Sequence, residues 1–173
     1  MQTMSAPFTR ALYTRLPEGF PAQLVDGVLV RDPLPTGGHQ ALVGALLLAT
    51  APLVGLRRAF VAPIDVALDE LNVLQPDLAI FDEPPPLDEH DLGLPAVVFE
   101  VLSPPNRRLD RTVKIRKYLA AGVREVWLVD PERETLEIHT LEDRRIHRRD
   151  RKARSTVVKD LVLVPAELFS VLR

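Results

Sequence analysis

The stretch over residues 95–130 constrains the fold of this chain more than any other. Residues 97–102 (VVFEVL) form an apolar run of the length expected for a fully buried strand. A helical pattern follows over residues 107–121, and a second apolar run at 126–129 ends in Asp-Pro. Strand, helix and strand within about 35 residues predict a βαβ unit with two parallel strands.

Glu100 is the only charged residue within the cores of these two predicted strands, so chemistry is expected there. A buried carboxylate is costly unless it is hydrogen-bonded, ion-paired or bound to a metal. A second acid, Asp77, lies in another predicted strand, LQPDLAIF, at residues 74–81. Because side chains alternate along a strand, both carboxylates can point at one spot if the two strands are neighbours.

Two adjacent carboxylates repel each other, and a divalent cation removes that repulsion. Hard oxygen ligands suit Mg²⁺ or Mn²⁺, with water completing the coordination. The alternative is that Asp77 and Glu100 are separate, each facing solvent at a strand end or pairing with an arginine.

Lys114 and His39 are further candidates for the same site. Lys114 follows Asp110 by one helical turn, a spacing that is equally typical of a surface ion pair. Lys117 competes with Lys114 for any role, and the spacing does not choose between them. His39 follows two glycines at a predicted helix start, where capping and surface histidines are more common. Tyr118 has the helical spacing of a core residue.

Length and composition predict one globular domain. The chain has 173 residues, 46% of them hydrophobic and 27% charged, with no cysteine and a net charge of -2. The absence of cysteine excludes disulfides, thiolate zinc sites and cysteine nucleophiles, and it suits a cytoplasmic protein. The N-terminus does not resemble a signal peptide. The longest apolar run, 41–56, is short for a bilayer span and contains Pro52, so no membrane association is expected.

The rest of the chain alternates between short strands and helices. The predicted elements are a hairpin over 20–32 with Asp26-Gly27 at its turn, a helix over 38–48 that Pro52 ends or kinks, one or two strands over 59–68, a loop over 82–95, a hairpin over 135–149, an edge strand over 155–164 and a helical turn from Pro165. Hairpins combined with one crossover predict an α+β (α/β) domain with a mixed sheet. Residues 1–19 are interpreted as an N-terminal extension and 20–173 as a single domain.

The segment over residues 144–154 (RRIHRRDRKAR) holds seven Arg or Lys in eleven residues. Such a segment predicts binding of a phosphate backbone, which makes affinity strongly salt-dependent. The candidate residues are Arg144, Arg145, Arg148 and Arg149. The alternative is a solvated hairpin with scattered ion pairs, which is favoured if the hairpin lies on the far side of the sheet from Asp77.

Several of these motifs, in this order, resemble one family. They are QLVDGVLV, GGHQALVGAL, QPDLAIF, VVFEVLSPPNRRLD, a D-x-x-x-K-x-x-x-Y spacing and AGVREVWLVDPE. The family is the Uma-two family of restriction-endonuclease-like proteins, within the PD-(D/E)XK nuclease superfamily, and the likeness covers roughly residues 20–170. It implies a mixed β-sheet flanked by helices near 38–50 and 107–121, with hairpins toward both termini.

The resemblance also implies roles for the candidate residues. Asp77 matches the aspartate of the superfamily's "PD", and Glu100 matches the acid of "(D/E)XK"; both are metal ligands there. Leu102 occupies the place of the usual lysine, and Lys114 fits the slot on the following helix from which this family supplies it. Lys114 would then assist the attacking water, and His39 would lie near the active site.

Gln23 departs from the family pattern, which usually has Glu at this position. Its carbonyl oxygen can coordinate a cation but adds no negative charge, which weakens a second metal position. The leading hypothesis is a metal-dependent endonuclease, using Mg²⁺ or Mn²⁺, that hydrolyses phosphodiester bonds in DNA. One alternative is a decayed nuclease fold that binds nucleic acid or protein. Another is a structural partner protein, and a homodimer is compatible with either.

Overall fold

The computed structural model describes residues 6–17, 19–31, 34–89, 92–103 and 109–173, without the side chains of residues 109–111. A six-stranded mixed sheet forms its centre, in the order β10-β9-β8-β7-β6-β3. The strands are β3 (Ala59–Val61), β6 (Leu78–Ile80), β7 (Val97–Val101), β8 (Glu125–Asp130), β9 (Thr135–His139) and β10 (Arg144–Arg148). The α+β architecture expected from the sequence is confirmed.

The predicted βαβ unit is present. Strands β7 and β8 pair in parallel, whereas every other pair in the sheet is antiparallel. The crossover contains a π-helical segment, η2 (Leu109–Lys114), followed by α3 (Ile115–Ala121). Gly122, with φ of 110°, ends α3 in the left-handed conformation that glycine tolerates best.

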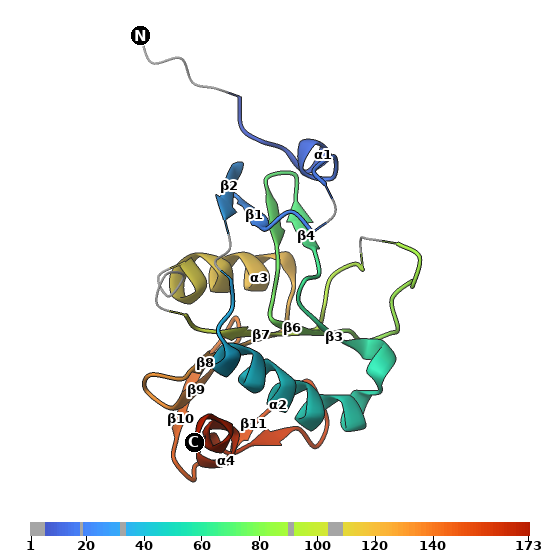
Figure 1. The fold of residues 1–173 in the computed structure, drawn as a ribbon. Helices are drawn as coiled ribbons and strands as arrows, with labels where there is room; N and C mark the ends of the chain where they lie inside the picture. Colours follow the sequence, from blue (N-terminus) through green and yellow to red (C-terminus); the bar gives the residue numbers. More distant parts are fainter. Residues whose placement is uncertain (1–5, 18, 32–33, 90–91, 104–108) are drawn as a thin grey trace.

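Helices cover the central sheet on both faces, with α3 above it and α2 (Gly37–Val54) below it in Figure 1. The core on the α2 side includes Leu42, Leu46, Val97, Phe99 and Trp127. The core on the α3 side includes Val98, Leu102, Ile115, Tyr118 and Leu128. This double coverage explains why β7 and β8 are buried along their whole length.

Helix α2 is longer than the sequence suggested. It continues to Val54 with Pro52 in its last turn, so the expected end near residue 48 is wrong. Among the described residues, α2 is long and apolar enough to cross a membrane by length and composition, contrary to the expectation. Its buried face, however, packs on the sheet through Leu42 and Leu46, as in the core helix of a globular domain.

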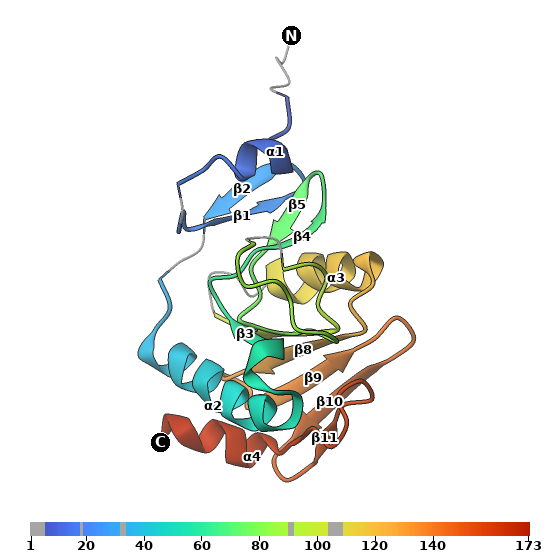
Figure 2. The same cartoon turned by 90° about the vertical axis from the view of Figure 1, so that its right-hand side faces the viewer.

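A smaller four-stranded sheet lies above α3, with α1 (Arg10–Tyr13) against it (Figure 2). Its order is β2-β1-β5-β4, made of β1 (Ala22–Val25), β2 (Val28–Arg31), β4 (Val66–Asp69) and β5 (Asn72–Leu74). The predicted hairpin is confirmed, because Asp26 and Gly27 both have positive φ, 50° and 73°, at the turn. Tyr13 packs beside Leu24 and thereby attaches α1 to this sheet.

Two strands predicted from the sequence are wrong in their extent. The run 74–81 is divided between β5 and β6, which belong to different sheets, because the chain leaves one sheet at Gln75 and enters the other after Asp77. Of the expected edge strand over 155–164, only Val162–Leu163 is a strand; it forms β12 and pairs with β11 (Ala153–Arg154), and residues 155–161 connect the two. The C-terminal helical turn is confirmed as α4 (Pro165–Leu168), followed by η3 (Phe169–Leu172).

Candidate active site

The two acids singled out in the sequence lie opposite each other, Glu100 on β7 and Asp77 immediately before the neighbouring strand β6. Strands β6 and β7 are antiparallel with Leu78 paired to Phe99, so the next position in register sets Asp77 across from Glu100. The Oδ2 atom of Asp77 accepts a hydrogen bond of 2.6 Å from the backbone N–H of Val101. The adjacency that the prediction required is therefore present.

Glu100 is buried in a network of side chains from the crossover. Lys114 Nζ lies 3.2 Å from Oε1 and 3.0 Å from Oε2 of Glu100, and the Tyr118 hydroxyl donates to Oε1 over 2.9 Å. Glu100 and Lys114 are each 2% exposed. A buried charge needs such compensation, so the network explains how a carboxylate is tolerated inside an apolar strand.

The structure separates the roles of the two candidate lysines. Lys114 faces Glu100, whereas Lys117 forms an ion pair with Asp26 at the turn of the N-terminal hairpin. Tyr118 belongs to the core, as its spacing suggested, but its hydroxyl also reaches Glu100. The sequence signal for this contact was the position of Tyr118 one helical turn after Lys114.

His39 belongs to α2, which covers the opposite face of the central sheet from α3 (Figure 1). Helix α2 begins with a Thr36 cap, whose side chain accepts a hydrogen bond of 3.2 Å from the His39 N–H. This start fixes His39 in the first turn, and its Nε2 atom lies 3.3 Å from Oδ1 of Asp77. The tertiary fold thus brings a residue from α2 beside a residue that precedes β6.

Gln23 holds the loop that carries Asp77. Its Oε1 atom accepts a hydrogen bond of 2.9 Å from the backbone N–H of Gln75, two residues before Asp77. The Gln75 side chain in turn donates to Asp65 over 2.9 Å and to the Tyr13 hydroxyl over 3.3 Å. Gln23 is 2% exposed and links the four-stranded sheet to the acid pair.

The donors at this site fit a hard divalent cation. Asp77 and Glu100 supply oxygen ligands only, and the Asp77 side chain is 17% exposed, which leaves a route from solvent. Within the described ranges, no group of three or more His, Asp or Glu side chains is arranged to hold a metal ion. Two carboxylates, with water and substrate phosphate completing the shell, are the usual protein environment of Mg²⁺.

A second buried acid, Glu125 at the start of β8, was not anticipated. Its carboxylate accepts hydrogen bonds from Ser155, from the backbone and hydroxyl of Thr156, and from Trp127, over 2.6 to 2.9 Å. Burial by itself raises the pKa of Glu125, but these hydrogen bonds outweigh it and lower that pKa below its ordinary value. Glu125 thereby anchors the segment that follows β11.

Glu100 is therefore not the only buried strand acid. Asp130 ends β8 and Glu137 lies in β9, and both are almost fully buried. The sequence did not single them out, because Glu125 and Asp130 stand just outside the apolar run 126–129 and Glu137 lies in a strand with alternating polarity. Their burial follows from the position of β8 and β9 inside the sheet.

The four arginines expected to hold a phosphate backbone divide into two pairs. Arg144 forms an ion pair of 2.8 Å with Glu137, and Arg145 lies 3.5 Å from Asp143. Arg148 and Arg149 are exposed and have no acidic partner within the part of the chain that the structure describes. Among the described side chains, Arg144 and Arg145 are thus engaged in ion pairs within the protein, whereas Arg148 and Arg149 are available to bind a phosphate.

The fold and the paired acids together define a restriction-endonuclease-like domain. The Uma2 family model, described as "Putative restriction endonuclease", matches residues 10–168, so the chain belongs to this family. No curated protein matches the chain significantly.

A matching solved structure has the same fold. It is described as a putative nuclease belonging to DUF820 from Anabaena variabilis. It has 23% sequence identity and a TM-score of 0.83, over 96% of this chain and 100% of that one. At this level of identity the match establishes the architecture, and the chemistry must be argued from the site.

Proposed function

We propose that this protein is a metal-dependent endonuclease that hydrolyses phosphodiester bonds in DNA. The observation that carries the proposal is the placement of Asp77, immediately before β6, across from Glu100 of β7, with Lys114 on Glu100. Membership of the Uma2 family supports nuclease chemistry in general.

In this proposal the carboxylates of Asp77 and Glu100 hold Mg²⁺ or Mn²⁺. Such a cation supplies Lewis-acid polarisation of a phosphoryl oxygen. Asp77 is held in place by the Val101 N–H, and Glu100 by the Tyr118 hydroxyl, so both acids are oriented before substrate arrives. Preorganised ligands of this kind need not rearrange during the reaction.

Lys114 carries the positive charge closest to Glu100. Its ammonium group contacts both carboxylate oxygens of Glu100. We assign to Lys114 the role of orienting the attacking water or a non-bridging phosphate oxygen, where its positive charge offsets developing negative charge. His39, beside Asp77, orients that carboxylate and is the nearest candidate for proton transfer.

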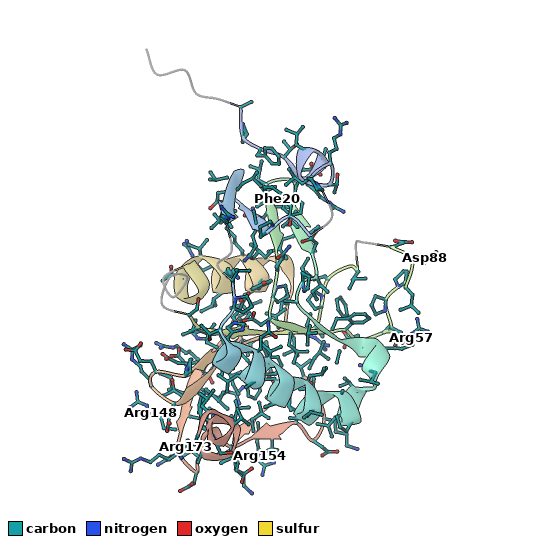
Figure 3. All side chains as sticks on the ribbon, viewed as in Figure 1. Phe20, Arg57, Asp88, Arg148, Arg154 and Arg173 are labelled. Atoms are coloured by element: carbon teal, nitrogen blue, oxygen red, sulfur yellow. The ribbon has the colours of Figure 1, made fainter. Side chains whose placement is uncertain are left out.

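A direct test combines metal binding with cleavage. Calorimetric titration with Mn²⁺ should give binding that Asp77→Asn and Glu100→Gln abolish, and the same variants should lose Mn²⁺-dependent cleavage of plasmid DNA. Asp88→Asn is a matched control, because Asp88 is exposed on the loop before β7, away from the acids (Figure 3). Cleavage that survives Glu100→Gln would overturn the proposal.

The second candidate is a nucleic-acid-binding module on a nuclease fold that has lost catalysis. The observation in its favour is Gln23, which stands where the resemblance to the family implies a carboxylate and whose oxygen already accepts the Gln75 N–H. This candidate predicts salt-sensitive DNA binding without Mn²⁺ binding and without cleavage. The calorimetric titration therefore distinguishes the two.

A further inference from the structure

The basic residues at one end of the central sheet surround a hollow. Arg133, Glu134, Arg148, Arg149 and Ala166 line a depression of about 430 Å³, formed by the β8–β9 turn, the end of β10 and the start of α4. A neighbouring hollow of about 620 Å³ shares Arg148 and Arg149 and adds Ile146, Asp150 and Arg151. Arg148 and Arg149 therefore stand between two concave surfaces.

The strand register locates this hollow relative to the acid pair. Parallel pairing sets Val101 of β7 beside Val129 of β8, so both strands end at the same edge of the sheet. The next position on β8, Asp130, pairs with Thr135, and Thr135 pairs with Arg148. Arg148 therefore lies at the same end of the strands as Glu100. A position at the other end would have favoured the alternative of a solvated hairpin without a role in binding.

Arg148 also shares a face of the sheet with Glu100. Paired residues point to the same side, and so do residues two apart on one strand. Glu100 pairs with Leu128, and Leu128 pairs with Glu137, which pairs with Ile146. Arg148 is two residues beyond Ile146 and thus projects from the same face.

The charges of this region are unevenly compensated. Arg133 pairs with Asp130 at 3.5 Å, and Arg173 pairs with Glu134 at 2.8 Å. Arg148, Arg149 and Arg151 are exposed, and the structure gives them no acidic partner among the described residues, although Asp150 lies between them in sequence. An excess of guanidinium groups around a hollow is suited to phosphate, which arginine binds through paired donors.

The half-buried His147 lies near several of these arginines. Burial, followed by the charges of Arg145 and Arg151, lowers the pKa of His147 below its ordinary value.

We infer that Arg148 and Arg149 form a phosphate-binding site for the DNA backbone, to one side of the bond that is cut. The inference rests on the proposed function for its substrate class and adds the location and spacing of the contact. Arg144 and Arg145 are excluded from it, because Glu137 and Asp143 already pair with them.

The distance between the acid pair and the bound phosphate follows from the geometry of the sheet. Three strand intervals separate β7 from β10, which is about 14 Å at the usual separation of neighbouring strands. A strand of B-form DNA advances about 3.4 Å per nucleotide. For DNA that runs across the strands of the sheet, the bound phosphate would therefore lie roughly four nucleotides from the acid pair.

The test measures DNA binding in EDTA, so that binding is scored without cleavage. A fluorescein-labelled 25-base-pair duplex is titrated by anisotropy at several salt concentrations with Arg148→Gln, Arg149→Gln and the double variant. Each lost phosphate contact should lower the slope of log affinity against log salt by about 0.9, and the double variant should bind roughly thirty-fold more weakly at 0.15 M salt.

Arg57→Gln is the matched control, because Arg57 is an exposed arginine on the opposite side of the molecule from Arg148 (Figure 3). It should leave the salt slope at the wild-type value. Absence of DNA binding by the wild type, or a double variant that binds with the slope of Arg57→Gln, would overturn the inference.

Failure of the two proposals can be told apart. If the salt slope falls as expected but Glu100→Gln leaves cleavage intact or the protein never cleaves, the phosphate site stands and the nuclease assignment fails. If Glu100→Gln abolishes cleavage while the arginine variants bind DNA normally, the nuclease assignment stands and the phosphate site fails.

Discussion

Lys114 Nζ lies 3.0 Å from Glu100 Oε2, and both side chains are 3% exposed. The pair joins the π-helical end of the crossover to the strand that precedes it. Because both charges are removed from water, each depends on the other, and their separation has consequences for stability as well as for chemistry.

Lys114→Met should destabilise the protein by about 3–5 kcal/mol, since it leaves Glu100 buried without its cation. Chemical denaturation monitored by circular dichroism measures this change. Lys117→Met is the control, because Lys117 pairs with the largely exposed Asp26, and loss of such a pair costs about 1 kcal/mol or less. The double variant Glu100→Gln/Lys114→Met should recover part of the loss; equal losses for Lys114→Met and Lys117→Met would contradict the prediction.

Glu125 should make stability depend on acid pH. Its pKa is lowered in the folded state, so the unfolded chain binds the proton more readily. The contribution of Glu125 is therefore fully present above the ordinary glutamate pKa of about 4.3 and is lost as pH falls through the lower folded value. Urea denaturation at pH 3 to 7 should show this loss in the wild type.

Glu125→Gln should flatten that acid dependence and, at pH 7, reduce stability by about 1.5–3 kcal/mol, the range for hydrogen bonds to a charged group. Glu83→Gln removes an exposed acid and serves as the control. Identical pH profiles for the wild type and Glu125→Gln would show that the buried carboxylate is not responsible.

Gln23→Glu should strengthen binding of Mn²⁺. The substitution adds a negative charge at the residue that holds the loop before Asp77, while the new carboxylate can still accept the Gln75 N–H. Stability without metal should fall, because the added charge is buried. Gln40→Glu makes the same chemical change at an exposed position of α2, and calorimetry should show no gain in affinity for it.

The distance between the acid pair and Arg148 predicts a limit on where DNA is cut. With end-labelled duplexes, the wild type should cut no closer than roughly four nucleotides to one of the two ends. Arg148→Gln/Arg149→Gln should relax this limit as overall cleavage weakens. Efficient cutting by the wild type at the terminal bond of both ends would refute the spacing.

The local structure was largely predictable because its signals are short-range. Asp26-Gly27 between apolar runs specified a hairpin, and two apolar runs separated by a helical pattern specified the crossover. The prediction of a single strand over 74–81 failed for a non-local reason. The run 74–81 has the composition of one strand, but its two halves enter different sheets, and no local pattern records that choice.

For the site, residue type and spacing in the sequence singled out Asp77 and Glu100 as a candidate pair and placed Lys114 and His39 among the candidates. Only the tertiary structure decided that β6 and β7 are neighbours, that Lys114 rather than Lys117 faces Glu100, and that α2 brings His39 to Asp77. It also decided which arginines are already paired. The physical reason is that side-chain partners are set by strand order and helix docking, which depend on burial across the whole chain.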